Sequence, residues 1–205
     1  MRPGVCIIAA PGPSLPSFGL DEHGTPHPII AVTSAVRAVR DAAHVYASDR
    51  RWWDACGDEV ARLHPQASRW MAPDCPGMGR DVWQASACRP PPAGVVVLDA
   101  NVTATGISRT PGLIHTGRNS GFAAINIAVL LGFTTLLLVG YDMREVDGKQ
   151  HFFGRYKDVR LDRESPYHEW VPLFRTIKCD GFEVINCTQG SAIDAFPFGV
   201  LGDYL

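Results

Sequence analysis

Two short polar clusters in this chain contain the residue types that bind phosphate. The first, Gly12-Pro13-Ser14, follows the apolar run VCIIAA of residues 5–10. A glycine lets the backbone turn sharply and brings N–H groups near a ligand, and Ser14 adds a hydroxyl. The spacing is neither that of a dinucleotide fingerprint nor that of a P-loop, which excludes both motifs. Taken alone, the cluster is either a phosphate-binding turn or a plain strand-to-loop turn.

The second cluster, Arg118-Asn119-Ser120-Gly121, stands directly before an apolar stretch typical of a helix. Asn119 or Ser120 can cap that helix. The free N–H groups and the positive end of the helix dipole then favour an anion. Arg118 can add bidentate contacts to a phosphate. The alternative is simple helix capping beside a surface arginine.

Two carboxylates and two histidines are further candidates. Asp49 and Asp142 each close a predicted strand, where a carboxylate can bind ribose hydroxyls, a base edge or a divalent ion. For Asp49 the alternative is the N-cap of the following helix. His151 and His168 lie in or beside a polar connection, and an imidazole that titrates near neutral pH can act as general base or acid. The alternative for each is a surface histidine without a role.

The sequence contains no zinc-binding motif and no Gly-x-Ser-x-Gly elbow, so it predicts neither a metal centre nor that class of hydrolase. Six cysteines without a Cys-x-x-Cys pair disfavour a thioredoxin-like motif, and the lack of a signal-like start disfavours a disulfide framework. The net charge of -2 gives no overall attraction to nucleic acid or to an anionic membrane. With no signal-like start and no long uninterrupted apolar span, we expect a cytoplasmic protein. A homo-oligomer is left open.

The elements that must position these groups follow from the apolar pattern. Continuous apolar runs predict strands over residues 5–10, 29–32, 44–47, 95–98, 136–139 and 182–186, and periodicity predicts helices over 34–43, 51–63, 122–131 and 166–177. This alternation predicts one Rossmann-like α/β domain over residues 1–205, with a mainly parallel sheet and helices on both faces. Ligands bind such sheets at the carboxyl ends of the strands, so the polar clusters should meet at one rim.

Two segments lack a clear pattern. Residues 73–92 are rich in Pro, Gly and Cys and are expected to be irregular. Residues 144–164 are strongly polar and have no apolar period, so they should bury little surface and be among the least stable parts of the fold. We predict that this connection is a lid that closes over a bound nucleotide. The alternative is a solvated loop with no role.

Several segments together resemble a known superfamily. The chain contains, in this order, IIAAPGPSLP, VYASDRRWWD, TGRNSGFAAINIAVLLGFTTLLLVGYDM, HFFG and EVINCTQGSAIDAFP. This order is similar to that of the superfamily shared by archaeal 6-hydroxymethylpterin pyrophosphokinase-like proteins and bacterial family 42 sialyltransferases, which also has small bacteriophage members. The resemblance spans nearly the whole chain. The Gly-Pro-Ser turn and the Ser-Gly…Leu-Gly…Gly-x-Asp run are its most specific parts.

The resemblance implies site roles. In these sialyltransferases the Gly-Pro-Ser turn and the Ser-Gly helix start surround a cytidine monophosphate sugar donor. The matching residues here are Gly12, Pro13, Ser14, Ser120 and Gly121. Arg118 matches the arginine that handles the phosphate, and His168 is the nearest match to the base that follows a lid. Tyrosines that follow the Gly-x-Asp motif are absent here, with Arg144 at one such position, and the lid is shorter, which argues against sialic acid as the sugar.

Three functions follow as expectations. The first is a nucleotide-dependent, glycosyltransferase-like enzyme with a nucleotide-sugar donor, CMP-type by resemblance, and a hydroxyl-bearing acceptor. Under this hypothesis, Arg118 and the helix start at Ser120 stabilise the leaving phosphate, and His168 or His151 deprotonates the acceptor hydroxyl. The second is transfer of diphosphate from ATP, with magnesium held by acidic residues such as Asp49 and Asp142. The third is a phage or host accessory protein without catalysis. A metal requirement favours the second, and nucleotide binding without turnover favours the third.

Overall fold

A seven-stranded, all-parallel sheet is the main feature of the computed structural model, which describes residues 4–74, 82–83, 89–158 and 160–205. Its strands, in chain order, are β1 (Val5–Ala9), β2 (Ile29–Val32), β3 (His44–Tyr46), β4 (Ser68–Met71), β6 (Val95–Val97), β9 (Thr135–Val139) and β10 (Glu183–Asn186). Their order in space is β10-β9-β1-β2-β3-β4-β6. The chain proceeds outward from β1 in one direction and then returns to place β9 on the other side of β1. The sheet therefore has its topological switch point between β1 and β9.

A small second sheet has the order β5-β7-β8, from β5 (Val82–Trp83), β7 (Asp99–Asn101) and β8 (Leu113–His115). Its strands β7 and β8 contribute Ala100 and Ile114 to the same core cluster as helix α2. The loop that leaves β8 leads directly into that helix. The second sheet therefore helps to hold the start of α2 in place.

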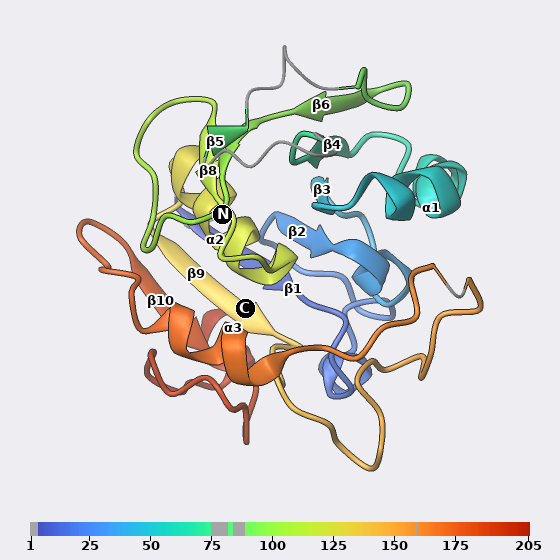
Figure 1. Ribbon diagram of the computed structural model, residues 1–205. Helices are drawn as coiled ribbons and strands as arrows, with labels where there is room; N and C mark the ends of the chain where they lie inside the picture. Colours follow the sequence, from blue (N-terminus) through green and yellow to red (C-terminus); the bar gives the residue numbers. More distant parts are fainter. Residues whose placement is uncertain (1–3, 75–81, 84–88, 159) are drawn as a thin grey trace.

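Three α-helices within the described residues cover the two faces of the main sheet: α1 (Arg50–Leu63), α2 (Ser120–Leu130) and α3 (Tyr167–Phe174). Neighbouring residues of a strand point to opposite faces. Thus Ile7 belongs to the cluster that contains Trp53 of α1, while Ile8 belongs to the cluster of α2 and α3. Figure 1 shows α2 lying across the sheet beside β1 and β2. The α/β fold class predicted from the sequence, with a parallel sheet and helices on both faces, is confirmed.

The helix predicted over residues 34–43 is wrong in length. The structure has only a 3-10 helix, η2 (Thr33–Arg37), in this region. The chain leaves helical geometry at Ala38, with φ -127°, and reaches the left-handed region at Asp41, with φ 54°. Among the described residues there are two further 3-10 helices elsewhere in the chain, η1 (Leu15–Phe18) and η4 (Leu201–Tyr204). The crossover from β2 to β3 is therefore short and mostly irregular.

Two other expectations are settled only in part. Much of the segment predicted to be irregular, residues 73–92, lies outside the described residues, although β5 falls within it. The connection over residues 144–164 has only isolated bridges, Val146 with Lys149 and His151 with Gly154, in its described part. Across the described ranges, no helix is both long enough and apolar enough to cross a lipid bilayer.

Candidate functional site

A cavity of about 550 Å³ opens at the carboxyl ends of β1, β2, β3 and β9, beside the N-terminus of α2. This is the rim that the sequence predicts, and Gly12 and Ser120 both line the cavity. Seven candidate residues from the sequence contribute to its wall: Gly12, Asp49, Arg118, Asn119, Ser120, Gly121 and His151. Four others do not line it: Pro13, Ser14, Asp142 and His168. The cavity therefore gathers the helix-start cluster completely and the glycine turn only in part.

The start of α2 presents free N–H groups to the cavity. Asn119 has extended backbone and caps the helix, because its side-chain oxygen accepts a hydrogen bond from the Phe122 N–H at 3.0 Å. The Ser120 hydroxyl accepts from the Ser48 N–H and donates to the Ser48 hydroxyl, both at 3.2 Å. Within the described part of the chain, the backbone N–H groups of Ser120 and Gly121 have no hydrogen-bond partner. They are the donors that a helix leaves open at its first turn.

The backbone before α2 carries Arg118 to the mouth of the cavity. Gly117 and Arg118 both adopt positive φ, 52° and 54°. A Cβ at Gly117 would lie 2.3 Å from the ring of Phe122, so glycine is required by space as well as by conformation. The Arg118 side chain is 70% exposed, and its guanidinium lies 3.6 Å from the carboxylate of Glu169 in the first turn of α3.

The donors of the glycine turn are used inside the protein. The Ser14 N–H and hydroxyl both donate to the same Asp142 oxygen, Oδ2, at 3.2 and 2.8 Å. Asp142 is only 4% exposed. The Gly12 N–H donates to the Gly140 carbonyl at 3.0 Å, and a Cβ at Gly12 would lie 2.2 Å from Asp142 Oδ2 and 2.3 Å from that carbonyl. The glycine is therefore required by the close approach of the turns after β1 and β9.

The segment that follows β10 supports the turn after β9. The Tyr141 N–H donates to the Thr188 hydroxyl at 3.0 Å, and the Ala192 N–H donates to the Asp142 carbonyl at 2.9 Å. The Tyr141 hydroxyl donates to the Gly121 carbonyl at 2.9 Å. These contacts connect the C-terminal segment, the turn after β9 and the start of α2 in one buried network.

Asp49 and Asp142, the magnesium candidates of the diphosphate-transfer alternative, each bond other groups of the protein. Asp49 is the N-cap of α1, accepts from the Arg51 N–H at 2.9 Å and forms an ion pair with the Arg51 guanidinium. Burial raises the pKa of Asp49, but the hydrogen bonds and charge of Arg51 outweigh this and hold it below its ordinary value. Asp142 bonds Ser14 instead and lies outside the cavity wall. Among the described residues, no three His, Cys, Asp or Glu side chains are placed to hold a metal ion.

Of the two candidate histidines, only His151 reaches the cavity. Its ring stacks on Phe153 with centroids 5.1 Å apart and meets the edge of Tyr156 at 5.5 Å. Burial lowers the pKa of His151 by more than the Pro11 backbone oxygen raises it, so the imidazole is neutral at neutral pH. The His168 side chain is 84% exposed, and its Nε2 lies 3.9 Å from Glu169 Oε1.

The connection over residues 144–164 buries more apolar surface than the sequence indicates. Phe152, Tyr156 and Leu161 pack against the core. The Tyr156 hydroxyl accepts from Ser34 at 3.1 Å, and the Phe152 N–H donates to the Pro11 carbonyl at 3.1 Å. The expectation of little burial fails here because these side chains cluster without a helical or strand period. Closure of the segment over a ligand stays a prediction.

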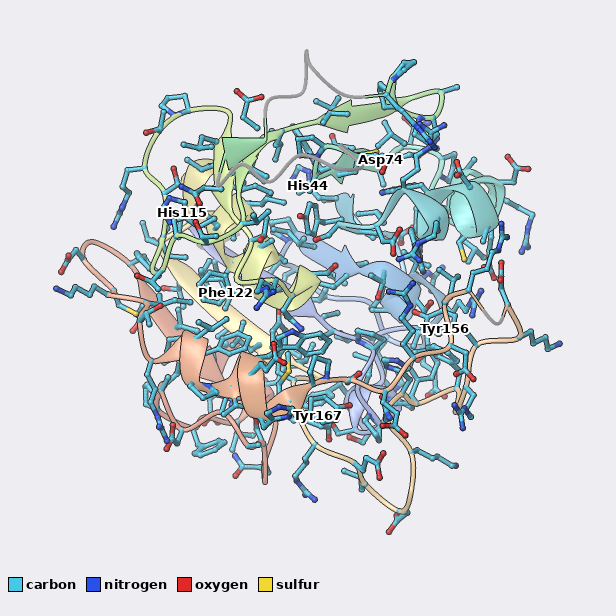
Figure 2. All side chains as sticks on the ribbon, in the orientation of Figure 1. His44, Asp74, His115, Phe122, Tyr156 and Tyr167 are labelled. Atoms are coloured by element: carbon cyan, nitrogen blue, oxygen red, sulfur yellow. The ribbon has the colours of Figure 1, made fainter. Side chains whose placement is uncertain are left out.

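Other residues that line the cavity were not among the site residues predicted from the sequence. Aromatic, polar and charged side chains come from the connection over residues 144–164 and from α3. These residues are Tyr156, Tyr167, Trp170, Gln150, Arg160, Arg163, Glu164 and Glu169. Trp52 of α1 lines the cavity as well. Figure 2 labels Tyr156 on the connection and Tyr167 at the start of α3. No local pattern indicates that these side chains meet, because they come together through tertiary structure.

Comparison of the chain with protein-family models, with curated proteins and with solved structures finds no match.

Proposed function

We propose that this protein is a nucleotide-dependent transferase, glycosyltransferase-like, with a nucleotide-sugar donor whose phosphate binds at the start of α2. The observation that carries the proposal is a pair of N–H groups, at Ser120 and Gly121, that have no partner among the described residues; both residues line one cavity with Arg118. This cavity lies at the topological switch point of a parallel sheet, where ligands of such folds bind.

The chemistry of this cluster suits an anion. Unpaired N–H groups and the helix dipole stabilise negative charge at the N-terminus of a helix by about 0.3–1 kcal/mol, and by up to about 2 kcal/mol when partly buried. Arg118 adds donors in a planar fork that matches a phosphate. The same groups would stabilise the charge that develops on the phosphate as it leaves the sugar.

Aromatic side chains from α1, the connection and α3 line the cavity and offer stacking surfaces for a base or a sugar ring. Trp52 and Tyr156 are linked through Ser34, which accepts from the Trp52 indole N–H at 3.3 Å and donates to the Tyr156 hydroxyl. Tyr167 and Trp170 of α3 form an edge-on pair with centroids 6.1 Å apart. The volume of about 550 Å³ lies in the range of small-molecule pockets.

His151 is the general base of the proposed reaction. Its neutral imidazole takes the proton from the acceptor hydroxyl, whose oxygen forms a bond to the anomeric carbon of the donor sugar. The bond from that carbon to the phosphate oxygen breaks, and its electron pair stays on the phosphate beside Arg118 and the start of α2. His168, which the resemblance matches to the base, lies on the exposed side of α3 and is not assigned this role.

The test is a thermal-shift screen of CMP, UDP, GDP and ATP with and without magnesium. A nucleotide present at one hundred times its dissociation constant should stabilise the fold by about 2.7 kcal/mol. If none of the four raises the melting temperature, the proposal fails. A shift that requires magnesium and ATP would instead favour diphosphate transfer. Binding without turnover of any nucleotide sugar would favour an accessory protein.

A further inference from the structure

The carboxylate of Glu169 stands between two of the groups that the sequence singled out. Its Oε2 lies 3.6 Å from the Arg118 guanidinium, and its Oε1 lies 3.9 Å from Nε2 of His168. Arg118 belongs to the turn before α2, whereas Glu169 belongs to the first turn of α3. Both residues line the cavity, so the ion pair lies in its wall.

In this ion pair, Glu169 contacts the same guanidinium that the phosphate of the proposed ligand would bind. The side chains of Arg118 and Glu169 are 70% and 50% exposed, so water and salt weaken their attraction. Exposed pairs of this kind favour the closed contact by a factor of about 1.4 to 5. A charge-assisted contact between arginine and phosphate is worth a factor of about 10 to 150. A phosphate that reaches Arg118 therefore outcompetes the carboxylate.

We propose that Glu169 is a resident counter-ion of Arg118, and that the phosphate of a bound nucleotide displaces it. This inference rests on the proposed nucleotide site. Displacement breaks the side-chain contact between the first turn of α3 and the turn before α2. Because coupling between two equilibria is reciprocal, removal of the Glu169 carboxylate, with Arg118 kept, strengthens nucleotide binding.

The experiment is a double-mutant cycle with wild type, Glu169→Gln, Arg118→Ala and the double variant. The probe is whichever of CMP, UDP, GDP and ATP gives the largest thermal shift, with its nucleoside as the phosphate-free probe, and calorimetry gives each dissociation constant. Glu169→Gln should tighten nucleotide binding about 1.4- to 5-fold and leave nucleoside binding unchanged. In the Arg118→Ala background the same substitution should have no effect.

Glu164→Gln is the matched control variant. Glu164 lines the same cavity and is exposed, and within the described residues it forms no ion pair. Glu164→Gln removes one negative charge from the cavity, as Glu169→Gln does. A smaller gain in nucleotide affinity than with Glu169→Gln would show that the contact with Arg118 matters and not only the net charge of the cavity. If both variants tighten binding equally, the proposed exchange is overturned.

Two failures are distinguishable. A wild-type chain that binds none of the four nucleotides overturns the proposed function, and with it this inference. If wild type and Glu169→Gln bind a nucleotide with equal affinity, the displacement of Glu169 by phosphate is overturned, but the proposed function is not. Tightening that persists in the Arg118→Ala background also overturns the exchange, because Arg118 would then not be the partner that Glu169 releases.

Discussion

Two turns at the same rim of the sheet differ in what their polar groups bind. In the turn after β1, the Ser14 N–H and hydroxyl both bond the buried Asp142, and the Gly12 N–H bonds a carbonyl. At the start of α2, two backbone N–H groups have no partner within the described chain, and within the same residues the Arg118 side chain pairs only with the exposed carboxylate of Glu169. The first turn is closed by the protein's own groups, and the second leaves its donors for a ligand.

Residue types alone do not show whether a glycine-serine turn binds phosphate. The type and spacing of its residues are compatible with phosphate binding, but a binding site needs donors that remain unpaired after folding. A glycine is required at position 12 in either case, because backbone and carboxylate oxygens approach it closely. Only the partners of its neighbouring donors separate a binding turn from a packing turn.

The largest expected effect is on the open turn. Arg118→Ala should weaken nucleotide binding about 10- to 150-fold, because it removes a charge-assisted phosphate contact worth about 1.5–3 kcal/mol. Its effect on the free energy of unfolding should stay within about 0.5 kcal/mol, since the side chain is largely exposed. Calorimetric titration and chemical denaturation measure the two quantities. Equal nucleotide affinity in variant and wild type would remove Arg118 from the site.

Substitution in the turn after β1, whose donors bond the protein's own groups, should change the free energy of unfolding. Gly12→Ala should destabilise the fold by about 1–3 kcal/mol, because the added methyl meets the Asp142 carboxylate and the Gly140 carbonyl at less than contact distance. The control is Gly57→Ala in the middle of α1, where a Cβ would make only an ordinary van der Waals contact with Trp53 at 4.0 Å and helix propensity predicts a gain of about 0.5–1 kcal/mol. Urea denaturation compares the two. A neutral Gly12→Ala would show that the two turns do not pack as described.

Ser14→Ala tests the comparison most directly. It removes one of two donors to Asp142 and should destabilise the fold by about 1 kcal/mol. Because Ser14 does not line the cavity, nucleotide affinity should change less than twofold, by analogy with other substitutions away from a site. If Ser14→Ala weakens nucleotide binding as strongly as Arg118→Ala does, the glycine turn contacts the ligand after all.

The smallest effect is a pH dependence from His151. Burial lowers its folded pKa below the unfolded value of about 6.5, so the unfolded state binds the proton first. The stabilisation is complete above about pH 6.5 and declines as the pH falls below it, by at most about 1.4 kcal/mol per pH unit. Burial lowers the pKa of His44 in the same direction, so the wild-type slope includes both residues.

The measurement is the free energy of unfolding between pH 5 and pH 7.5, in wild type and in His151→Gln. The variant should lose part of the wild-type slope. The matched control is His168→Gln, which replaces an exposed histidine outside the cavity wall. An unchanged slope in His151→Gln would show that this ring is not held neutral by burial.

Much of the fold could be predicted from the sequence, because the central strands are buried on both sides and are therefore continuously apolar. β1, β2 and β9 are examples, and Asn119 was among the predicted caps of α2. β4 was not predicted, since its first residues, Ser68 and Arg69, are polar, and β7 has only three residues with two polar ones.

The site was predicted less completely because its decisive contacts join distant parts of the chain. Ser14 meets Asp142 from across the sequence, and nothing local to either residue indicates that pairing. The contact between Arg118 and Glu169 depends on where α3 packs, which periodicity does not reveal. The location of the cavity followed from topology, whereas the partner of each donor followed only from tertiary structure.

The order of strands in the sheet has a consequence for how the chain folds. β1 is hydrogen-bonded to β2 on one side, but on the other side Val5 pairs with Thr135 of β9. During synthesis the strands β1, β2, β3, β4 and β6 can associate early, while the second edge of β1 waits until α2 and β9 have left the ribosome. Contacts between residues so far apart in sequence close large loops and slow folding. The apolar strand VCIIA therefore keeps an unpaired edge for much of that time, and this edge is where a nascent chain would aggregate or recruit a chaperone.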